Sequence, residues 1–181
     1  WGVPVPDILI TSVGTEIHYG PGLRRDDGWA VHLRHPWRRE ALALALTGAP
    51  GLKLQPEANQ GELKLSYEVD PARMSSVERL YTRLREKGLK ARLVYSQGKY
   101  LDVIPLRAGK GPALRYIALR EGLSPSHFVV AGDSGNDADM LLGDTRAVVV
   151  GNYKPELEPL RGSERIHFAT ATYARGILEG L

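Results

Sequence analysis

The chain has 181 residues, of which 43% are hydrophobic and 25% are charged, and its formal net charge is +3 at pH 7. This balance is typical of a globular protein, and the length suits one ordinary domain or one domain with a modest insertion. The absence of cysteine excludes disulfides and thiolate metal sites. The basic residues are scattered and no apolar run is long enough for a membrane span, so we expect no binding to nucleic acid or membranes. We expect a cytoplasmic protein.

The first third of the chain is expected to hold short strands and a helix. Ile8–Thr11 is an apolar run that predicts a buried strand, and residues 16–18 predict a short extended piece after it. Asp, Asp and Gly at positions 26–28 are typical of a turn. Residues 36–48 have high helix propensity and end in glycine, so they predict a helix.

The middle of the chain predicts antiparallel strands with helices on one face. Residues 63–69 alternate between apolar and polar side chains, which indicates a half-buried strand. Ser75 is followed three positions later by Glu78, a capping box that predicts the start of a helix. Residues 93–96 and 100–104 flank a glycine turn and predict a β-hairpin.

The last third alternates helices with short apolar strands. Gly111 and Pro112 open a predicted helix that ends at Gly122. The elements expected after it are a strand at 128–131, a helix from about 137, a strand at 147–150, a helix at 155–160, a strand at 166–169 and a last helix from 173. Helices that alternate with unbroken Val-rich strands favour a doubly wound parallel sheet covered on both faces.

The change of pattern along the chain predicts an α/β core interrupted by an insertion. Residues 1–14 and 106–181 are expected to form the doubly wound core. Residues 15–105 are expected to form an inserted α/β cap that contains the antiparallel strands.

The chemistry is concentrated in a polar loop that follows the strand at 128–131. The loop reads G-D-S-G-N-D and holds two carboxylates, Asp133 and Asp137, with Ser134 and Asn136 between them. A loop between a strand and a helix is where α/β proteins build sites at the carboxyl end of a sheet. Two converging carboxylates suit Mg²⁺, and Asn136 and the loop N–H groups could donate to a phosphate. The alternative is an ordinary polar turn, which has the same composition.

Lys110 is the second chemical feature of the sequence. It lies between glycines at the start of a predicted helix, where its amine could hold a phosphate as a point charge. The alternative is a solvated surface lysine. Because the following helix leads into the strand that carries Asp133, we expect the amine and the two loop carboxylates to face one pocket.

These motifs resemble a known superfamily. K-G-x-A-L, followed by a strand and G-D-S-G-N-D-x-x-M-L, resembles motifs three and four of the haloacid dehalogenase (HAD) superfamily of phosphotransferases. P-D-I-L-I-T-S-V-G-T-E-I, L-K-L-S-Y-E-V-D, S-Q-G-K-Y-L-D-V-I-P and A-R-G-I-L-E-G-L are similar to segments of sucrose-phosphate phosphatases. They are also similar to the phosphatase-like C-terminal domain of sucrose-phosphate synthases. The resemblance covers essentially the whole chain and implies an HAD-like fold for the core.

The resemblance also implies roles for individual residues. Asp133 and Asp137 would hold or support Mg²⁺, and Lys110 and Asn136 would contact phosphate near the nucleophile. The residues expected to be catalytic are Lys110, Asp133 and Asn136, those expected to bind phosphate are Lys110, Ser134 and Asn136, and those expected to bind the sugar are Lys64, Gln97 and Lys99.

One part of the family pattern has no match. The family's nucleophile lies in a D-x-D segment after the first strand, and the only D-x-D in this chain, at 137–139, lies inside the later motif. An aspartyl-phosphate cannot form without that carboxylate. We therefore expect roughly 50 further residues, about two βα units, at the amino end. Their strands would lie between those at Ile8–Thr11 and 128–131, and this chain alone should be inactive.

Three functions are compatible with these observations. The first is an Mg²⁺-dependent phosphatase that acts on sucrose 6-phosphate, a small-molecule sugar phosphate. The second is a phosphatase-like domain fused to or associated with a glycosyltransferase, with a catalytic, binding or structural role. The third is a structural or interaction module without catalysis.

Overall fold

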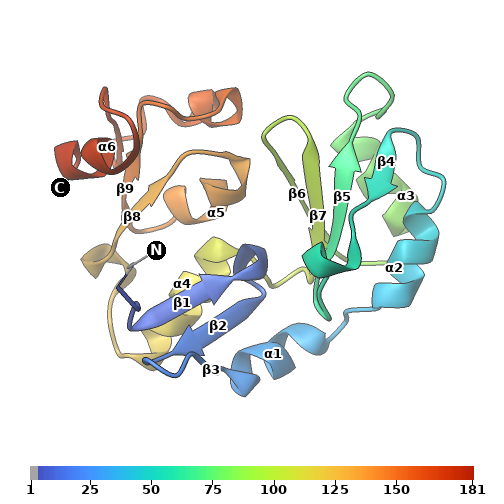
Figure 1. Ribbon diagram of the computed structural model, residues 1–181, viewed down its shortest axis with the longest axis horizontal. Coiled ribbons are helices and arrows are strands. Elements are labelled where there is room, and N and C mark those ends of the chain that lie inside the picture. Colours follow the sequence, from blue (N-terminus) through green and yellow to red (C-terminus); the bar gives the residue numbers. More distant parts are fainter. Residues whose placement is uncertain (1–3) are drawn as a thin grey trace. The chain divides into compact units, whose positions relative to one another are not determined.

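The computed structural model describes residues 4–181, and its helices and strands are labelled in Figure 1. The residues form two compact units, one ending at Gly109 and the other comprising Lys110–Leu181. The division into a core of residues 1–14 and 106–181 and a cap of residues 15–105 stays a prediction. Among residues 4–181, no helix has both the length and the apolar character needed to cross a membrane.

The first unit begins with a small antiparallel sheet in the order β1-β2-β3. Its strands are β1 (Ile8–Thr11), β2 (Glu16–Tyr19) and β3 (Arg24–Arg25), and the helix α1 (Asp27–Arg34) follows them. The predicted turn at 26–28 was wrong, because the Asp26 carboxylate accepts the Trp29 N–H at 2.9 Å and so caps α1. The buried Trp29 ring donates its indole N–H to the Gly14 carbonyl, which fixes α1 to the connection between β1 and β2.

The same unit holds a second sheet, antiparallel, in the order β4-β5-β7-β6. Its elements are β4 (Leu52–Leu54), β5 (Leu65–Val69), β6 (Arg92–Ser96) and β7 (Tyr100–Ile104), with the helices α2 (Arg39–Leu46) and α3 (Val77–Glu86). The predicted hairpin is confirmed as β6 and β7. The two helices and the apolar face of the sheet share one core, which includes Leu42, Leu46, Leu84 and Leu101. The N-cap of α3 is Ser76, not the predicted Ser75, because the Ser76 hydroxyl accepts the Arg79 N–H.

The second unit contains a parallel sheet, as predicted, and its strand order is β10-β9-β8. Its elements are the strands β8 (Val129–Gly132), β9 (Arg146–Val149) and β10 (Ile166–Phe168) and the helices α4 (Lys110–Arg120), α5 (Ala138–Leu141) and α6 (Tyr173–Glu179). Short 3-10 turns lie at Ser12–Gly14, Glu57–Asn59, Pro125–His127, Gly135–Asp137 and Pro155–Leu160.

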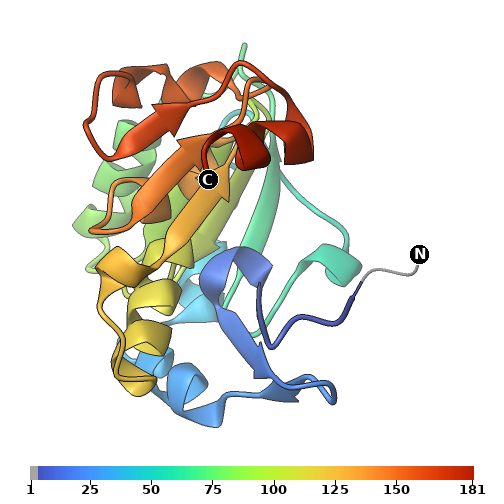
Figure 2. The same cartoon turned by 90° about the vertical axis from the view of Figure 1, so that its left-hand side faces the viewer.

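Helices cover both faces of the parallel sheet. On one face, Val130 and Val149 pack with Leu141 of α5 and with partly buried Leu114 of α4. On the other face α6 lies against β9, and Figure 2 looks onto this side of the unit. Side chains alternate across each strand, so the central strand contributes a buried residue to each face.

Two of the sheet-edge strands within residues 4–181 are those that the sequence predicted to flank further core strands. β8 pairs with β9 alone, and β1 pairs with β2 alone. Unpaired strand edges are positions where another strand can add. That two further core strands lie between these edges stays a prediction.

Candidate active site

The loop after β8 is organised by the buried carboxylate of Asp137. β8 ends at Gly132, and a 3-10 turn at Gly135–Asp137 leads into α5. The Asp137 Oδ2 accepts the backbone N–H groups of Asp133 at 3.0 Å and Ser134 at 3.2 Å. These two hydrogen bonds fold the carboxylate back over the strand end and define the shape of the loop.

Gly132 is required by this arrangement because the carboxylate packs directly on it. A Cβ at position 132 would lie 2.5 Å from the Asp137 Cβ and 2.7 Å from its carboxyl carbon. Distances under 3 Å do not occur between a Cβ and another heavy atom without displacement. The glycine of the G-D-S-G-N-D motif therefore provides the space into which Asp137 folds.

Lys110 reaches the loop from the first residue of α4. Its Nζ lies 2.5 Å from the Asp137 Oδ1 and 3.0 Å from the Asn136 Oδ1. The sequence predicted that the lysine faces both loop carboxylates. The structure shows its contact with Asp137, and a pocket shared with Asp133 stays a prediction. About a third of the Lys110 side chain remains exposed, so the ammonium group can still meet a ligand.

The second loop side chain, Asn136, is oriented by the same contacts. Its Oδ1 accepts from Lys110 and, at 3.3 Å, from the hydroxyl of the buried Ser134. Both donors act on the oxygen, and within residues 4–181 the amide nitrogen has no hydrogen bond. The amide N–H groups are therefore available to donate to an anion such as phosphate.

Asp133 differs from Asp137 in having a carboxylate that is not engaged. Within residues 4–181 it makes no side-chain hydrogen bond or ion pair, whereas both Asp137 oxygens have donors. Asp133 therefore fits as one oxygen ligand for Mg²⁺, and Asp137 fits better as a support for the loop. No group of three or more His, Asp or Glu residues that could hold a metal is present in the described part of the chain. A complete metal site would need further ligands, and direct metal binding by Asp137 stays a prediction.

The three residues predicted to contact the sugar do not lie together. Lys64 directly precedes β5, and its Nζ lies 3.9 Å from the Asp102 carboxylate. Gln97 and Lys99 lie in the turn after β6, at the other end of this strand pair, because Tyr100 pairs with Glu68. Lys99 lies opposite Val69, whose N–H donates to the Lys99 carbonyl. At ~3.3 Å per residue, the two groups are therefore separated by about 16 Å along the sheet.

The lysines of this sheet already have partners within the unit. The Lys99 ammonium lies 4.7 Å from the centre of the Tyr100 ring, and its hydrogen bond to Tyr100 raises the pKa of Lys99. The Asp102 carboxylate that faces Lys64 also accepts the Ser66 hydroxyl at 2.5 Å. Neither Ser66 nor Asp102 was predicted from the sequence, although both lie on the polar face of their strands.

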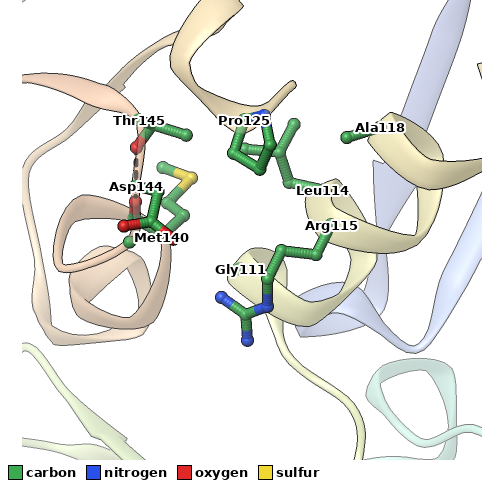
Figure 3. A pocket seen from close by; sticks show the side chains of 9 residues that line it. Gly111, Leu114, Arg115, Ala118, Pro125, Met140, Asp144 and Thr145 are labelled. Carbon is green, nitrogen blue, oxygen red and sulfur yellow. Dashed lines mark hydrogen bonds between the residues drawn. The ribbon is translucent and has the colours of Figure 1, made fainter. Parts of the chain in front are cut away.

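A small hollow, partly open to solvent and with a volume of about 10 Å³, lies beside the site in the same unit. Figure 3 shows it between α4 and the segment after α5. Its lining consists of Gly111, Leu114, Arg115, Ala118, Pro125, Met140, Gly143, Asp144 and Thr145. None of the loop residues or Lys110 lines it, so it is separate from the candidate site.

One protein family matches the chain over its whole length. The profile of the sucrose-6F-phosphate phosphohydrolase family matches residues 1–181. Sucrose-phosphatase 1 of Nicotiana tabacum is 38% identical over 97% of this chain, but the match covers only 44% of that enzyme. The mannosylfructose-phosphate phosphatase of Agrobacterium fabrum is 34% identical over 99% of this chain and 73% of its own length. The chain thus spans less than half the length of the tobacco relative.

Solved structures give the same result for the fold. The crystal structure of the sucrose-phosphatase from Synechocystis sp. PCC6803, in complex with sucrose and phosphate, matches with a TM-score of 0.90 and 34% identity. This match covers 98% of the chain and 74% of the Synechocystis structure. A haloacid dehalogenase-like hydrolase from Bacillus subtilis matches with a TM-score of 0.59 at 19% identity, over 97% of this chain and 67% of the other, which supports the fold alone. The predicted HAD-like α/β fold is confirmed.

Proposed function

Because the chain belongs to the sucrose-6F-phosphate phosphohydrolase family, we propose that the full-length protein is an Mg²⁺-dependent phosphatase that hydrolyses sucrose 6-phosphate to sucrose and inorganic phosphate. The observation that carries this proposal is the contact of the Lys110 ammonium with Asn136 and Asp137, beside the free Asp133 carboxylate. A cation, an amide donor and an oxygen ligand for a metal are the groups that phosphoryl transfer requires.

In this proposal the phosphoryl group binds next to Lys110. Its negative oxygens meet the lysine ammonium and the Asn136 amide N–H groups, which neutralise the charge of the group during transfer. Asp133 holds Mg²⁺, which when bound neutralises phosphoryl charge as a Lewis acid. Ser134 keeps Asn136 in place through its hydroxyl. Its backbone N–H already donates to Asp137, so direct contact of Ser134 with phosphate stays a prediction.

Asp137 acts through Lys110 in this proposal. Its carboxylate pairs with the ammonium and keeps the side chain over the loop, and it also holds the backbone of Asp133 and Ser134. Direct coordination of Mg²⁺ by Asp137, which the family resemblance implies, stays a prediction. In either role a charged Asp137 is needed to keep the amine in place.

The attacking carboxylate is a separate requirement. The loop residues do not include a free aspartate in addition to the metal ligand, so we propose that the nucleophile belongs to sequence that the longer relatives have and this chain does not span. Contacts of Lys64, Gln97 and Lys99 with the sugar, a fused or associated glycosyltransferase, and a cytoplasmic location likewise stay predictions.

A second substrate is supported by one relative. The Agrobacterium enzyme that matches 99% of the chain is a mannosylfructose-phosphate phosphatase. Mannosylfructose phosphate is therefore the second candidate substrate. The two candidate substrates differ in their disaccharide, mannosylfructose or sucrose.

The test is phosphate release by the full-length protein from both sugar phosphates. We expect turnover of sucrose 6-phosphate with Mg²⁺ and loss of turnover in EDTA. Lys110→Ala should lower kcat/KM about 100-fold, because it removes a charged donor to the transferred group. Lys53→Ala removes an exposed lysine that lies 3.9 Å from Glu68, and it should leave activity unchanged.

Two results would contradict the proposal. The full-length protein could release no phosphate from either substrate in the presence of Mg²⁺. Lys110→Ala could instead keep the activity of the Lys53→Ala control. The chain of residues 1–181 alone should show no turnover.

A further inference from the structure

The helix that carries Lys110 begins without a capping residue of its own. An α-helix leaves its first N–H groups without partners, and Ser, Thr, Asp or Asn just before the helix normally accepts one of them. The four residues before α4 are Leu106, Arg107, Ala108 and Gly109, and none of them can do so. The first N–H groups of α4 therefore depend on water or on an acceptor from another part of the chain.

Asp139 supplies this acceptor from the second residue of α5. Its Oδ1 accepts the Gly111 N–H at 3.0 Å, which is the hydrogen bond that an N-cap side chain would make. The negative carboxylate also lies at the positive end of the α4 dipole, where it is stabilising. This is the one aspartate of the D-x-D at 137–139 that the proposed chemistry does not use.

The backbones of the two helices are in close contact at the same point. A Cβ on Gly111 would lie 2.2 Å from the Asp139 carbonyl oxygen and 3.0 Å from the Met140 nitrogen. Figure 3 shows Gly111 and Met140 on the facing sides of the hollow between these segments. Gly111 and Asp139 therefore form a direct joint between the first turn of α4 and the first turn of α5.

This joint controls both ends of the Lys110 side chain. The Lys110 backbone directly precedes Gly111 in α4. The Lys110 ammonium contacts Asn136 and Asp137, which directly precede α5 and its residue Asp139. A shift of α4 along α5 would move the amine relative to Asp137 and Asn136. Displacements of about 1 Å in a positioned catalytic group can cost 100-fold in rate.

We propose that Asp139 is a positioning residue that sets the place of the Lys110 ammonium by capping α4 from α5. This inference rests on the proposed function, because only a reaction at Lys110 makes that position matter. Asp139 itself does not contact the phosphoryl group. Its removal should act through the lysine.

The experiment compares Asp139→Ala, Asp139→Asn and Asp144→Ala in the full-length protein. Asp139→Asn keeps an oxygen that can accept the Gly111 N–H. Asp144→Ala is the control. Asp144 lies in the loop after α5, and its exposed carboxylate pairs with Arg165, the residue before β10. Each variant is assayed for kcat, KM and inhibition by inorganic phosphate. The Lys110 methylene signal is followed by NMR with ¹³C-labelled lysine and is assigned by its absence in Lys110→Arg.

We expect Asp139→Ala to lower kcat/KM about tenfold, to weaken phosphate inhibition by a similar factor and to shift the Lys110 signal. Asp139→Asn should recover most of the loss, and Asp144→Ala should match the wild type in all readouts. If Asp139→Ala is unfolded, the proposal is judged on Asp139→Asn, whose Lys110 signal must stay at the wild-type position.

The inference is overturned if Asp139→Ala folds and the Lys110 signal and kcat/KM do not change. It is also overturned if activity falls while the lysine signal stays in place. A shifted lysine signal in a full-length protein that lacks phosphatase activity would refute the proposed function alone.

Discussion

The Asp137 carboxylate is almost completely buried, with 6% of the side chain exposed, and both of its oxygens accept hydrogen bonds from the chain itself. Burying a carboxylate costs several kcal/mol unless charges and donors compensate for it. Hydrogen bonds to charged groups contribute about 1.5–3 kcal/mol each. Two backbone N–H groups and the Lys110 ammonium provide this compensation, so the loop is held in one shape before any ligand arrives.

Gly132→Ala tests this packing directly. The added methyl group would displace the Asp137 side chain, because its Cβ would lie 2.5 Å from that of Asp137. We expect a loss of about 1–3 kcal/mol of stability, the usual cost of overpacking, and a melting temperature lower by several degrees. Phosphatase activity of the full-length protein should fall in parallel.

The control for this prediction is Gly22→Ala. A Cβ on Gly22 would have no other heavy atom within 4 Å, so alanine fits there without displacing a neighbour. Its substitution should leave the melting temperature and activity unchanged. Thermal unfolding by circular dichroism and phosphate release measure the two effects. Equal melting temperatures for the two variants would mean that Asp137 does not require the space above Gly132.

The sequence predicted that Lys110 and the acidic loop lie together, which the contacts show, but it did not predict the direction of every side chain. The order of Lys110, β8 and the loop was enough to predict that the amine would lie near Asp137. The two aspartates looked equivalent as metal ligands, however, and only the coordinates separate the engaged Asp137 from the free Asp133. The one signal for Asp139 was the absence of a capping residue before α4, which leaves N–H groups that must find an acceptor.

Among the elements of the second unit, α6 packs closely against the parallel sheet and the segment after β10 through two glycines and one carboxylate. A Cβ on Gly176 would lie 2.3 Å from the Ala171 carbonyl oxygen, and one on Gly180 would lie 2.5 Å from the Val148 side chain. The Glu179 carboxylate accepts the N–H groups of Thr170 and Ala171 at 2.9 and 2.8 Å. Close backbone contact and this carboxylate together hold the helix to the end of β10.

The attachment of α6 should depend on pH through Glu179. Hydrogen bonds from Thr170 and then Ala171 lower the pKa of Glu179 from 4.5 to about 2. A lowered folded-state pKa contributes stability above the unfolded-state value, and this contribution is lost as the pH falls from about 4.5 towards 2. We therefore expect Glu179→Gln to be less stable than the wild type at pH 6, with a smaller difference at pH 3.

Urea unfolding at the two pH values measures this difference. Glu121→Gln is the control, because Glu121 is exposed and its side chain has no partner within residues 4–181. A stability difference for Glu179→Gln that is the same at both pH values would show that the charge of this carboxylate does not hold α6.

Most elements were predictable from the sequence, and the errors have local causes. Strands such as β8 and β9 are short apolar runs rich in β-branched residues and bounded by turn residues, and this composition and length identify them as strands. Asp and Gly are common both in turns and at helix starts, which explains why the beginning of α1 was taken for a turn. Two adjacent serines compete to cap α3, and composition does not decide between Ser75 and Ser76.

The whole molecule contains separate hydrophobic cores in its two units. Leu101 is fully buried in the core formed by the sheet of β4 to β7 and its helices, and Leu141 is buried against the parallel sheet. Each unit therefore has a core of its own to stabilise it. The overall class could be predicted because the two parts of the chain have different strand patterns. The sequence placed the change of pattern after residue 105, and the units divide at Gly109.

Substitutions in the two cores should act on one unit each. Leu101→Ala and Leu141→Ala should each cost about 2–5 kcal/mol, because each leaves a cavity in a packed core. In hydrogen exchange measured by mass spectrometry, Leu101→Ala should reduce protection in peptides from residues 4–109. Leu141→Ala should reduce protection in peptides from 110–181. Loss of protection across the whole chain in both variants would show that the two units unfold as one.

The boundary between the units falls at the peptide bond between Gly109 and Lys110. Gly109 has a φ of 137°, a backbone conformation that side-chain-bearing residues rarely adopt, and Lys110 is already tied to the second unit through its ammonium. The lysine therefore belongs with the acidic loop both in chain order and in its contacts, because the second unit alone contains the ammonium, Asn136 and Asp137.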